Sequence, residues 1–470
     1  MIDTAAPLRP RAGQAPQAAA RRRRRVRPAG LLRWAAALAA VAGVLVSVGM
    51  MAHRVPVGSR AGHYRYHYVR TFGLDVLWPF LLTAIVVVLG LWLSHRWYER
   101  HRAVVVTGWL AVAVPLQLLM RRSDDVALPD LVTSTRANGF LEPARRYSVW
   151  EFLSGHVGIG AGLDSHARTN MAGKTVFYQV LTALTDSPTT MGVLTVAAST
   201  LSCLLVYLIA ADLLDPRTAL YALALSILVP GRLFFLPILN TVSPVPILLA
   251  LWLLVRYLRR PHWGWAAAMG AVLYATMFFE PLPLALGLVF AALTAWARGT
   301  GRLSWAGAAA LAGLAACGFL ACYGLLRVLV GYDLAANFAY VLADARGFND
   351  DGHRPYQVWV VRNLWDFAIA AGLPTVLLVA AAVADAARRG LWRAGAVLAV
   401  SAATVLVVLD LLGVNRGETV RLWIFLAVLW QLPAAWLCAR TARLWPIAVV
   451  AAATALQAAT GMAMIAFVRI

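Results

Sequence analysis

Long uninterrupted apolar runs recur along this chain, and they restrict its fold more than any other feature. About thirteen of them have the roughly 17–25 residues that an α-helix needs to cross a bilayer. The runs are continuous and do not alternate polar with apolar residues, which excludes a membrane β-barrel. Because lipid offers the backbone no hydrogen-bond partner, helices remain. We therefore predict an all-α polytopic membrane protein.

The expected spans fall into two groups, separated by a long polar segment. Three spans precede it, at residues 31–51, 76–94 and 103–120. Ten follow it, at residues 191–211, 218–235, 242–258, 262–279, 281–297, 304–330, 363–385, 391–413, 422–438 and 444–468. Residues 1–30 are rich in Pro, Ala and Arg, and we expect a disordered basic arm there. It would precede one transmembrane domain, residues 31–470.

The charge of the chain is positive, but it does not indicate a nucleic-acid partner. The net charge is +21, yet charged residues make up 13% of the chain, and most arginines stand between apolar runs. The tendency of cytoplasmic loops to be basic explains that distribution. The four cysteines lie inside apolar runs without the spacing of metal ligands, and no phosphate-loop motif for ATP occurs.

Placing the N-terminal arm in the cytoplasm of a bacterial cell gives a consistent topology in the plasma membrane. Nearly every connection on the cytoplasmic side is then short and basic, as this tendency requires. The external connections are 52–75, 121–190, 236–241, Glu280, 331–362 and 414–421. They hold most of the acidic residues of the loops, mixed with Arg, His and Asn. We therefore expect the active face to be external.

The long external loop, residues 121–190, is the main candidate for an active-site cap. Apolar residues at helical spacing predict two short amphipathic surface helices, near residues 147–157 and 176–184. The loop also holds His166, Lys174, which is the only lysine of the chain, and five aspartates, three of which follow the third span within ten residues. A carboxylate at the membrane edge is suited to accept a proton from a substrate hydroxyl. The candidates for that base are Asp130, Asp124 and Asp125, and solvated loop charges are the alternative interpretation.

Two later external segments contain pairs of opposite charges one helical turn apart. Arg362 and Asp366 stand at the head of a span, and Glu418 and Arg421 stand before another. Either pair is consistent with a local helix ion pair. For Glu418 and Arg421, the functional interpretation is an arginine held by a carboxylate so that it can bind a phosphate oxygen. For Arg362 and Asp366, it is that charges at the membrane edge are costly and often functional. Glu280 lies on the same face in a very short turn.

Four stretches of sequence form a further pattern. They are residues 133–140 (TSTRANGF), 166–173 (HARTNMAG), 354–374, with Arg-Pro-Tyr, Asp-Phe and Gly-Leu-Pro, and 417–423 (GETVRLW). Together with the large first external loop, this pattern resembles bacterial integral-membrane glycosyltransferases of the GT-C fold, over roughly residues 104–440. These enzymes use a sugar carried on a polyprenyl phosphate.

The resemblance implies roles for individual residues. The base would be one of the three aspartates, and Arg421 and Lys174 would neutralise the departing polyprenyl phosphate. Glu418 would orient Arg421, and His166 would hold the loop or the acceptor, a cell-envelope glycan or lipid. Arg362 and Asn170 complete the expected set of binding residues. The chain departs from the family pattern at Asn170-Met171-Ala172, where His-Pro-Pro is common, and at Asn240, where Asp is common.

Two other functions remain open at this stage. A lipid or solute transporter, or a flippase, would have discontinuous helices and ionisable residues near the middle of the membrane. A catalytically inactive scaffold of the cell envelope would agree with the departure at residues 170–172. No cofactor is indicated by the sequence. A divalent cation between loop carboxylates is conceivable, although no ligand spacing marks such a site.

Overall fold

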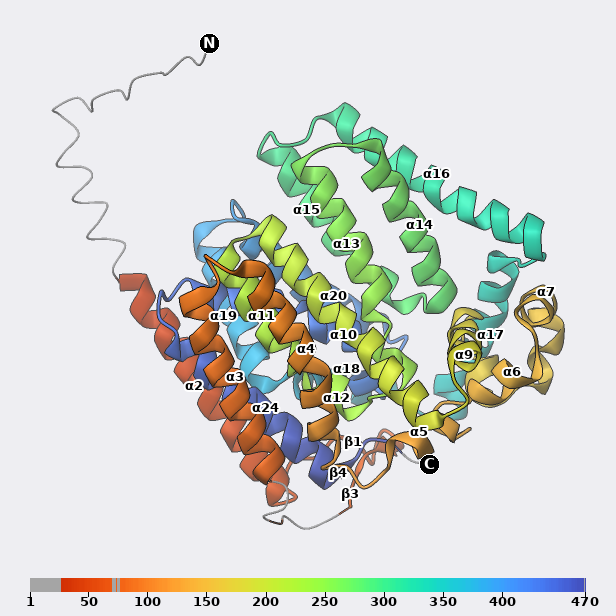
Figure 1. Cartoon of the computed structure of the whole chain (residues 1–470), viewed down its shortest axis with the longest axis horizontal. Coiled ribbons are helices and arrows are strands. Elements are labelled where there is room, and N and C mark those ends of the chain that lie inside the picture. Colours follow the sequence, from red (N-terminus) through yellow and green to blue (C-terminus); the bar gives the residue numbers. More distant parts are fainter. Residues whose placement is uncertain (1–26, 70–72, 74–76, 469) are drawn as a thin grey trace.

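The computed structural model describes residues 27–69, 73, 77–468 and 470, so most of the expected N-terminal arm lies outside the described residues. The first three helices, α2 (Arg27–Met51), α3 (Leu77–Trp97) and α4 (Arg102–Arg121), match the first three expected spans. Helix α3 packs against α4, and α24 (Trp445–Met464) packs against both α2 and α3 on the same flank of the molecule (Figure 1). The second group of spans begins with α10 (Pro188–Leu213).

The remaining helices of the membrane region follow in sequence with short breaks. They are α11 (Pro216–Ile227), α12 (Pro230–Phe234), η3 (Leu239–Thr241), α13 (Pro244–Arg259), α14 (Trp263–Phe279), η4 (Leu282–Leu286), α15 (Gly287–Gly299), α16 (Trp305–Val330), α18 (Tyr356–Ala371), α19 (Leu373–Arg389), α20 (Ala394–Leu412), α21 (Thr419–Leu422), α22 (Ile424–Leu429), α23 (Gln431–Ala439) and α24 (Trp445–Met464). Proline occupies the first or second position of many of them, where its missing N–H and fixed φ suit a helix start.

The number of spans is lower than the thirteen that we expected. Among the described residues, ten helical segments are long and apolar enough to cross a membrane, or eleven if one bent pair counts as a span. That pair is α18 and α19, which meet at an angle of 109°. Gly372 and Pro374 stand at the bend, and each disfavours a continuous helix. The other two expected spans, α14 and residues 424–439, are helical but shorter than 18 residues.

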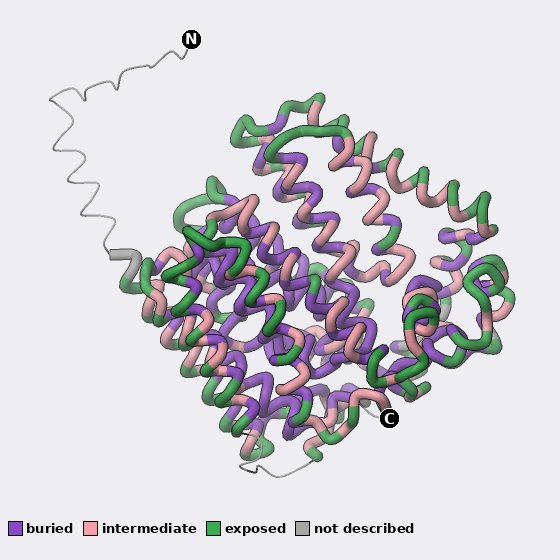
Figure 2. Tube along the Cα trace, viewed as in Figure 1, coloured by how far each residue is buried: buried purple, intermediate pink, exposed green. Residues whose placement is uncertain are grey.

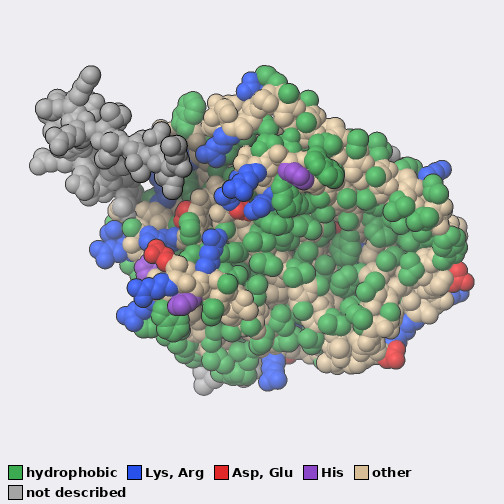
Figure 3. All heavy atoms as spheres, turned by 45° about the horizontal axis from the view of Figure 1, so that its top comes forward, with side chains coloured by type: hydrophobic (Ala, Val, Ile, Leu, Met, Phe, Trp, Pro, Cys, Tyr) green, Lys and Arg blue, Asp and Glu red, His purple; other side chains and the backbone are tan. Residues whose placement is uncertain are grey.

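Burial divides the helices into an inner and an outer group. In the segment 216–234, formed by α11 and α12, 94% of the residues in an apolar window of 18 residues are buried. In α16 the corresponding share is 11%. Figure 2 shows the buried residues concentrated in the middle of the bundle and exposed ones along its outer helices. Hydrophobic side chains also cover much of the surface in the space-filling view, as lipid contact requires (Figure 3).

The long polar segment folds into short helices that pack beside the ends of the bundle. They are α5 (Leu128–Thr133), α6 (Leu141–Arg146), α7 (Val149–Ile159), η2 (Gly160–Gly162), α8 (Ser165–Arg168) and α9 (Gly173–Leu184). The two expected surface helices correspond to α7 and α9. Ser148 and Glu151 form a capping box that starts α7. A further helix, α17 (Leu334–Asp351), lies in the segment 331–362.

Two small sheets involve the loop 52–75, and one of them ties it to the C-terminal end of the chain. Strand β1 (Gly58–Ser59) pairs with β2 (Tyr64–Arg65), and β3 (His67–Tyr68) pairs with β4 (Ile465–Ala466) near the C-terminus. The aromatic ring of Phe467 stacks on Phe234 at 4.0 Å. Chain segments from both ends of the sequence therefore meet at the same end of the bundle.

Candidate functional site

A cavity of about 1190 Å³ lies where these segments meet. Every connection that the sequence analysis assigned to the external side contributes at least one residue to its wall. These connections are the loop 52–75, the cap 121–190, the segment 236–241 through Ile238, Glu280, the segment 331–362 and the segment 414–421. Residues 466–468 close it from the C-terminal side. Polar residues far apart in sequence therefore face one space.

The cavity is strongly basic. Among the described residues, its wall holds three carboxylates, Glu280, Asp351 and Glu418, and three histidines. It also holds seven arginines, which are Arg60, Arg65, Arg136, Arg168, Arg354, Arg416 and Arg421. Because two of the carboxylates are already ion-paired, as described below, positive charge remains in excess. Such a wall suits an anionic ligand, and guanidinium groups suit phosphate in particular.

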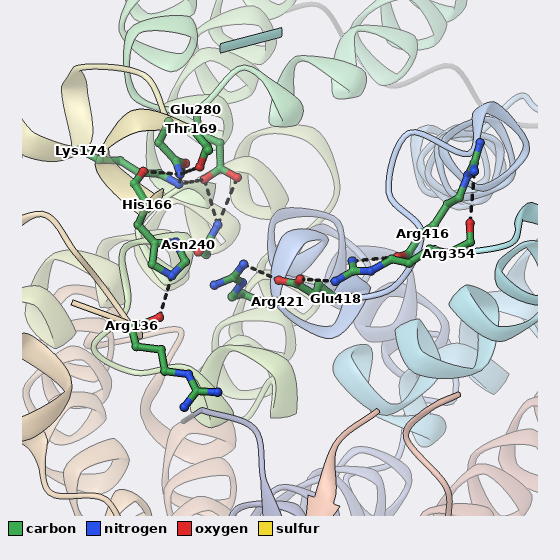
Figure 4. Close-up of polar contacts among 11 residues, drawn as sticks. Arg136, His166, Thr169, Lys174, Asn240, Glu280, Arg354, Arg416, Glu418 and Arg421 are labelled. Atoms are coloured by element: carbon green, nitrogen blue, oxygen red, sulfur yellow. Dashed lines mark hydrogen bonds and ion pairs between the residues drawn. The ribbon is translucent and has the colours of Figure 1, made fainter. Parts of the chain in front are cut away.

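Glu418 lies between two arginines on one side of the cavity. One of its oxygens accepts a hydrogen bond from Arg354 at 3.1 Å, and the other lies 2.5 Å from Nη2 of Arg421. Burial raises the pKa of Glu418, but the charges of Arg421 and Arg354 outweigh burial and leave its pKa below the ordinary value. The carboxylate is therefore ionised and fixes both guanidinium groups. Figure 4 shows Arg421 projecting from this pair toward His166.

The same arginine pair is supported by an aromatic ring. The guanidinium of Arg354 lies 4.6 Å from the ring centroid of Tyr64, on β2. Burial, followed by the nearby charge of Glu418, raises the pKa of Tyr64 to about 12, so its hydroxyl stays protonated. Tyr64 therefore presents a neutral hydrogen-bonding group beside the arginines.

Glu280 forms a second polar cluster with Lys174. The Lys174 ammonium lies 3.0 Å from Oε2 of Glu280 and donates to Oδ1 of Asn170 at 2.8 Å. Asn240 and Ser243 also donate to Glu280. Lys174 and Glu280 are both buried, and Lys174 does not line the cavity. The ion pair therefore fixes α9 to the turn between α14 and η4, with only the carboxylate facing the cavity.

His166, on α8, lies on the cavity wall near Arg421 (Figure 4). Its Nε2 is 2.8 Å from the backbone carbonyl of Arg136, so Nε2 carries the proton and donates it. Burial, and then the charge of Arg421, lower the pKa of His166 below its ordinary value. The imidazole is therefore neutral near pH 7, with Nδ1 as a hydrogen-bond acceptor.

One face of α18 positions the loops on both sides of the arginine pair. Trp359 donates from its indole N–H to Gly62 O at 3.1 Å. Asn363 donates to Asn415 O at 2.8 Å and accepts from the Gly417 N–H at 3.2 Å. One helical turn further on, Asp366 accepts from the Gly58 N–H with both carboxylate oxygens. The three side chains recur at i, i+4 and i+7, and so share one helix face.

The predicted site residues divide into two groups in the structure. His166, Asn170, Glu418 and Arg421 line the cavity, and Lys174 lies directly behind Glu280. Arg362 does not line it and instead forms the local ion pair with Asp366 at 3.3 Å, while also contacting the Pro56 carbonyl. Arg362 therefore connects α18 to the loop 52–75 and has a structural role.

The three aspartates predicted as candidate bases are absent from the cavity wall. Asp124 pairs with Arg121 and accepts a hydrogen bond from the Val126 N–H at 2.9 Å, while Asp125 and Asp130 have exposed side chains. The interpretation of Asp124 as a loop charge that balances Arg121 fits this arrangement. The structure thus gives none of the three a position from which to act on a ligand in the cavity.

Several wall residues escaped the sequence analysis. Arg136, Arg354 and Tyr64 lie inside segments that we had assigned to the external side, but no spacing singled them out. Arg354 belongs to the Arg-Pro-Tyr stretch of the resemblance, which was the available signal. Within the described part of the chain, no group of three or more His, Cys, Asp or Glu side chains is arranged to hold a metal ion.

Comparison with known proteins adds no relative. No protein-family model matches the chain, and no curated protein matches it either.

Proposed function

We propose that this protein transfers a sugar from a polyprenyl-phosphate carrier to a hydroxyl group of a cell-envelope glycan or lipid. The support is the basic cavity beside a helical bundle with ten or eleven candidate spans. A polyprenyl chain needs a hydrocarbon environment, while its phosphate needs cationic partners. The motif resemblance to GT-C glycosyltransferases points to the same chemistry.

The observation that carries this proposal is the Arg354–Glu418–Arg421 cluster. Glu418 holds both guanidinium groups in place before any ligand arrives. Fixed cations aimed at a phosphate stabilise the negative charge that develops as a phosphate leaves, without the cost of reorganising solvent. In our proposal Arg421 takes the role that the resemblance gives it, with Arg354 as a second cation. Lys174 has the different role of holding Glu280.

His166 is the proton acceptor in this scheme. The acceptor hydroxyl gives its proton to Nδ1 of His166, and the oxygen forms a bond to the anomeric carbon. The bond between that carbon and the phosphate oxygen breaks, and polyprenyl phosphate leaves with the electron pair. A positioned base of this kind contributes about 10²–10⁴-fold to the rate.

The cavity would open to the external side of a bacterial plasma membrane, with the N-terminus in the cytoplasm. The support is the charge pattern of the connections, because the short basic ones are clustered at the other ends of the helices. Cysteine labelling from outside intact cells tests this orientation, with single cysteines at Ser148, in the cap, and at Thr300, after α15.

A transfer assay tests the function itself. Purified full-length protein would receive polyprenyl-phosphate sugars with a radioactive label, and lipid or glycan acceptors extracted from cell envelopes. Transfer by wild type and its loss in Arg421→Gln are the expected results. Absence of transfer by wild type with every donor supplied, despite proven binding of polyprenyl phosphate, would favour a scaffold without catalytic activity.

One observation favours a transporter or flippase as the second candidate. The α18–α19 pair is bent by 109°, and Arg232 on the adjacent short helix α12 is fully buried. Discontinuous helices and buried charges are typical of transporters. Arg232, however, donates to the carbonyls of Ser199 and Ile227, which indicates a structural role. Movement of labelled lipid across proteoliposomes without sugar transfer would decide for this candidate.

A further inference from the structure

A second cavity, of about 340 Å³, lies at the opposite ends of helices that border the first one. Helix α13 begins next to Ser243, which contacts Glu280, and ends at Arg259 on the wall of this second cavity. The segment η4–α15 likewise runs from Leu282, in the first cavity, to Trp296 in the second. The two cavities are therefore separated by about the length of α13, roughly 24 Å at 1.5 Å per residue.

The second cavity lies at the level where three candidate spans end. These are 188–213, 239–259 and 282–299. Lipid phosphates lie just beyond the hydrocarbon thickness that such spans cross. A ligand in this cavity is therefore at the depth of a phospholipid headgroup.

Arginines outnumber carboxylates in and around this cavity, so its net charge is positive even when the ion pairs are counted. Among the described residues, Asp212 is the only acidic one on its wall. Asp212 already contacts Arg259 and Arg256 and accepts a hydrogen bond from the indole N–H of Trp252 at 2.9 Å. Arg302 is the second arginine of the wall, and no carboxylate among the described residues pairs with it. One carboxylate thus faces three guanidinium groups.

Aromatic contacts hold Arg302 in place. Its guanidinium lies 4.7 Å from the ring centroid of Trp296, and the Trp296 indole N–H donates to the Trp392 carbonyl at 3.2 Å. The backbone N–H of Arg302 donates to Ala297 O at 2.9 Å, which fixes the turn after α15. Arg302 is exposed, so its donors can reach a ligand without being removed from another partner.

We propose that this second cavity binds the phosphate headgroup of an anionic membrane phospholipid. Arg302 and Arg259 are the charged contacts, and the Trp296 ring forms the side wall. Guanidinium groups bind phosphate oxygens with paired hydrogen bonds, and basic pockets between membrane helices recruit anionic lipids. This lipid is not a substrate, because its site is separate from the first cavity. The proposal does not depend on the glycosyltransferase function.

Native mass spectrometry of the full-length protein tests this site. The protein is released from mixed micelles that contain either phosphatidylglycerol or phosphatidylcholine, and retained lipids are counted. We expect wild type to retain one phosphatidylglycerol more strongly than any phosphatidylcholine. Loss of a charge-assisted contact in Arg302→Gln should weaken that retention about tenfold or more.

Arg393 provides a matched control. It is exposed and directly follows Trp392, so it lies at the same end of the molecule, but it does not line the cavity. Arg393→Gln should retain phosphatidylglycerol like wild type. Equal retention of the two lipids by wild type, unchanged retention in Arg302→Gln, or equal losses in both variants would overturn the proposal. Because Arg302 is exposed, a folding defect is not expected, and an unchanged melting temperature verifies this.

Discussion

The ammonium group of Lys174 lies 3.0 Å from the carboxylate of Glu280, and both side chains are buried. This pair joins the cap to the bundle, since Lys174 is the second residue of α9 and Glu280 directly follows α14. Burial lowers the pKa of Lys174, and the charge of Glu280 opposes that effect. The cap is therefore held at the cavity by an interaction between opposite charges in a nearly water-free place.

Breaking this pair on one side should destabilise the protein. Lys174→Met leaves the Glu280 charge buried without its cation, which costs roughly 3–5 kcal/mol. The double variant Lys174→Met/Glu280→Gln removes both charges and should recover part of the loss. Thermal unfolding in detergent measures the three proteins. A single variant as stable as wild type would show that the pair contributes nothing.

Replacing Arg421 should reduce transfer more than replacing other arginines. Arg421→Lys keeps the charge but loses the planar donor pair that Glu418 orients, and we expect transfer to fall about 10²-fold. Arg362→Lys is the matched control, because Arg362 pairs with Asp366 outside the cavity wall. Initial rates with a radioactive donor provide the measurement. Similar losses in the two variants would mean that Arg421 has only a structural role.

The aspartates of the cap should be dispensable for transfer. Asp125→Asn and Asp130→Asn change exposed side chains that do not line the cavity, so each variant should keep a rate within about threefold of wild type, on the scale of ordinary surface substitutions. Asp124→Asn also changes a side chain outside the cavity wall and should keep a similar rate, although it removes the ion pair with Arg121 and can lower stability. His166→Gln should lose about 10²-fold or more, because the base is removed. A large loss in Asp130→Asn would return that residue to the role that the sequence suggested.

The pH profile should report His166. Neutral imidazole accepts the proton, so the rate falls as pH decreases through the pKa of His166 in the folded protein. Burial and the charge of Arg421 place that pKa below the ordinary value of 6.5. We therefore expect the acidic limb of the profile to have its midpoint below pH 6.5 and the rate to level off toward higher pH. The same acidic limb in His166→Gln would assign the titration to another group.

The loop that carries Glu418 should not tolerate a side chain at Gly417. This glycine has φ +89°, and an added Cβ would lie 3.0 Å from the Trp359 ring. Gly417→Ala should therefore cost about 1–3 kcal/mol. Gly313→Ala, on α16, is the control, because a Cβ there meets no atom within 4 Å. Limited proteolysis compares the two, and equal resistance would contradict the expected strain.

The sequence was sufficient to predict where most of the long helices lie, but not where they are interrupted. Continuous apolar runs predicted the spans, since a helix in lipid needs little beyond length and hydrophobicity. The bend between α18 and α19 depends on packing as well as on Gly372 and Pro374, and the pattern of apolar residues does not reveal it. The expected count of thirteen therefore differs from ten or eleven at this bent pair and at two apolar helices, α14 and residues 424–439, that are shorter than 18 residues.

For the site, charge pattern indicated segments more reliably than individual residues. Glu418 and Arg421 are close in sequence, so their pairing could be predicted from helical spacing. The Lys174–Glu280 pair joins distant parts of the chain, and no local rule predicts such a contact. The three aspartates were chosen because they follow a span, but Asp124 and Asp125 lie between α4 and α5, Asp130 lies on α5, and none of them lines the cavity wall.

Trp359 is packed between the loop of Gly62 and the loop of Gly417. A single indole ring thus separates the hairpin that presents Tyr64 from the segment that presents Glu418. Neither loop can shift inward alone without meeting that ring. If the cavity changes shape when a lipid enters, both loops must move together with α18, so the wall residues Tyr64 and Glu418 will keep their positions relative to each other.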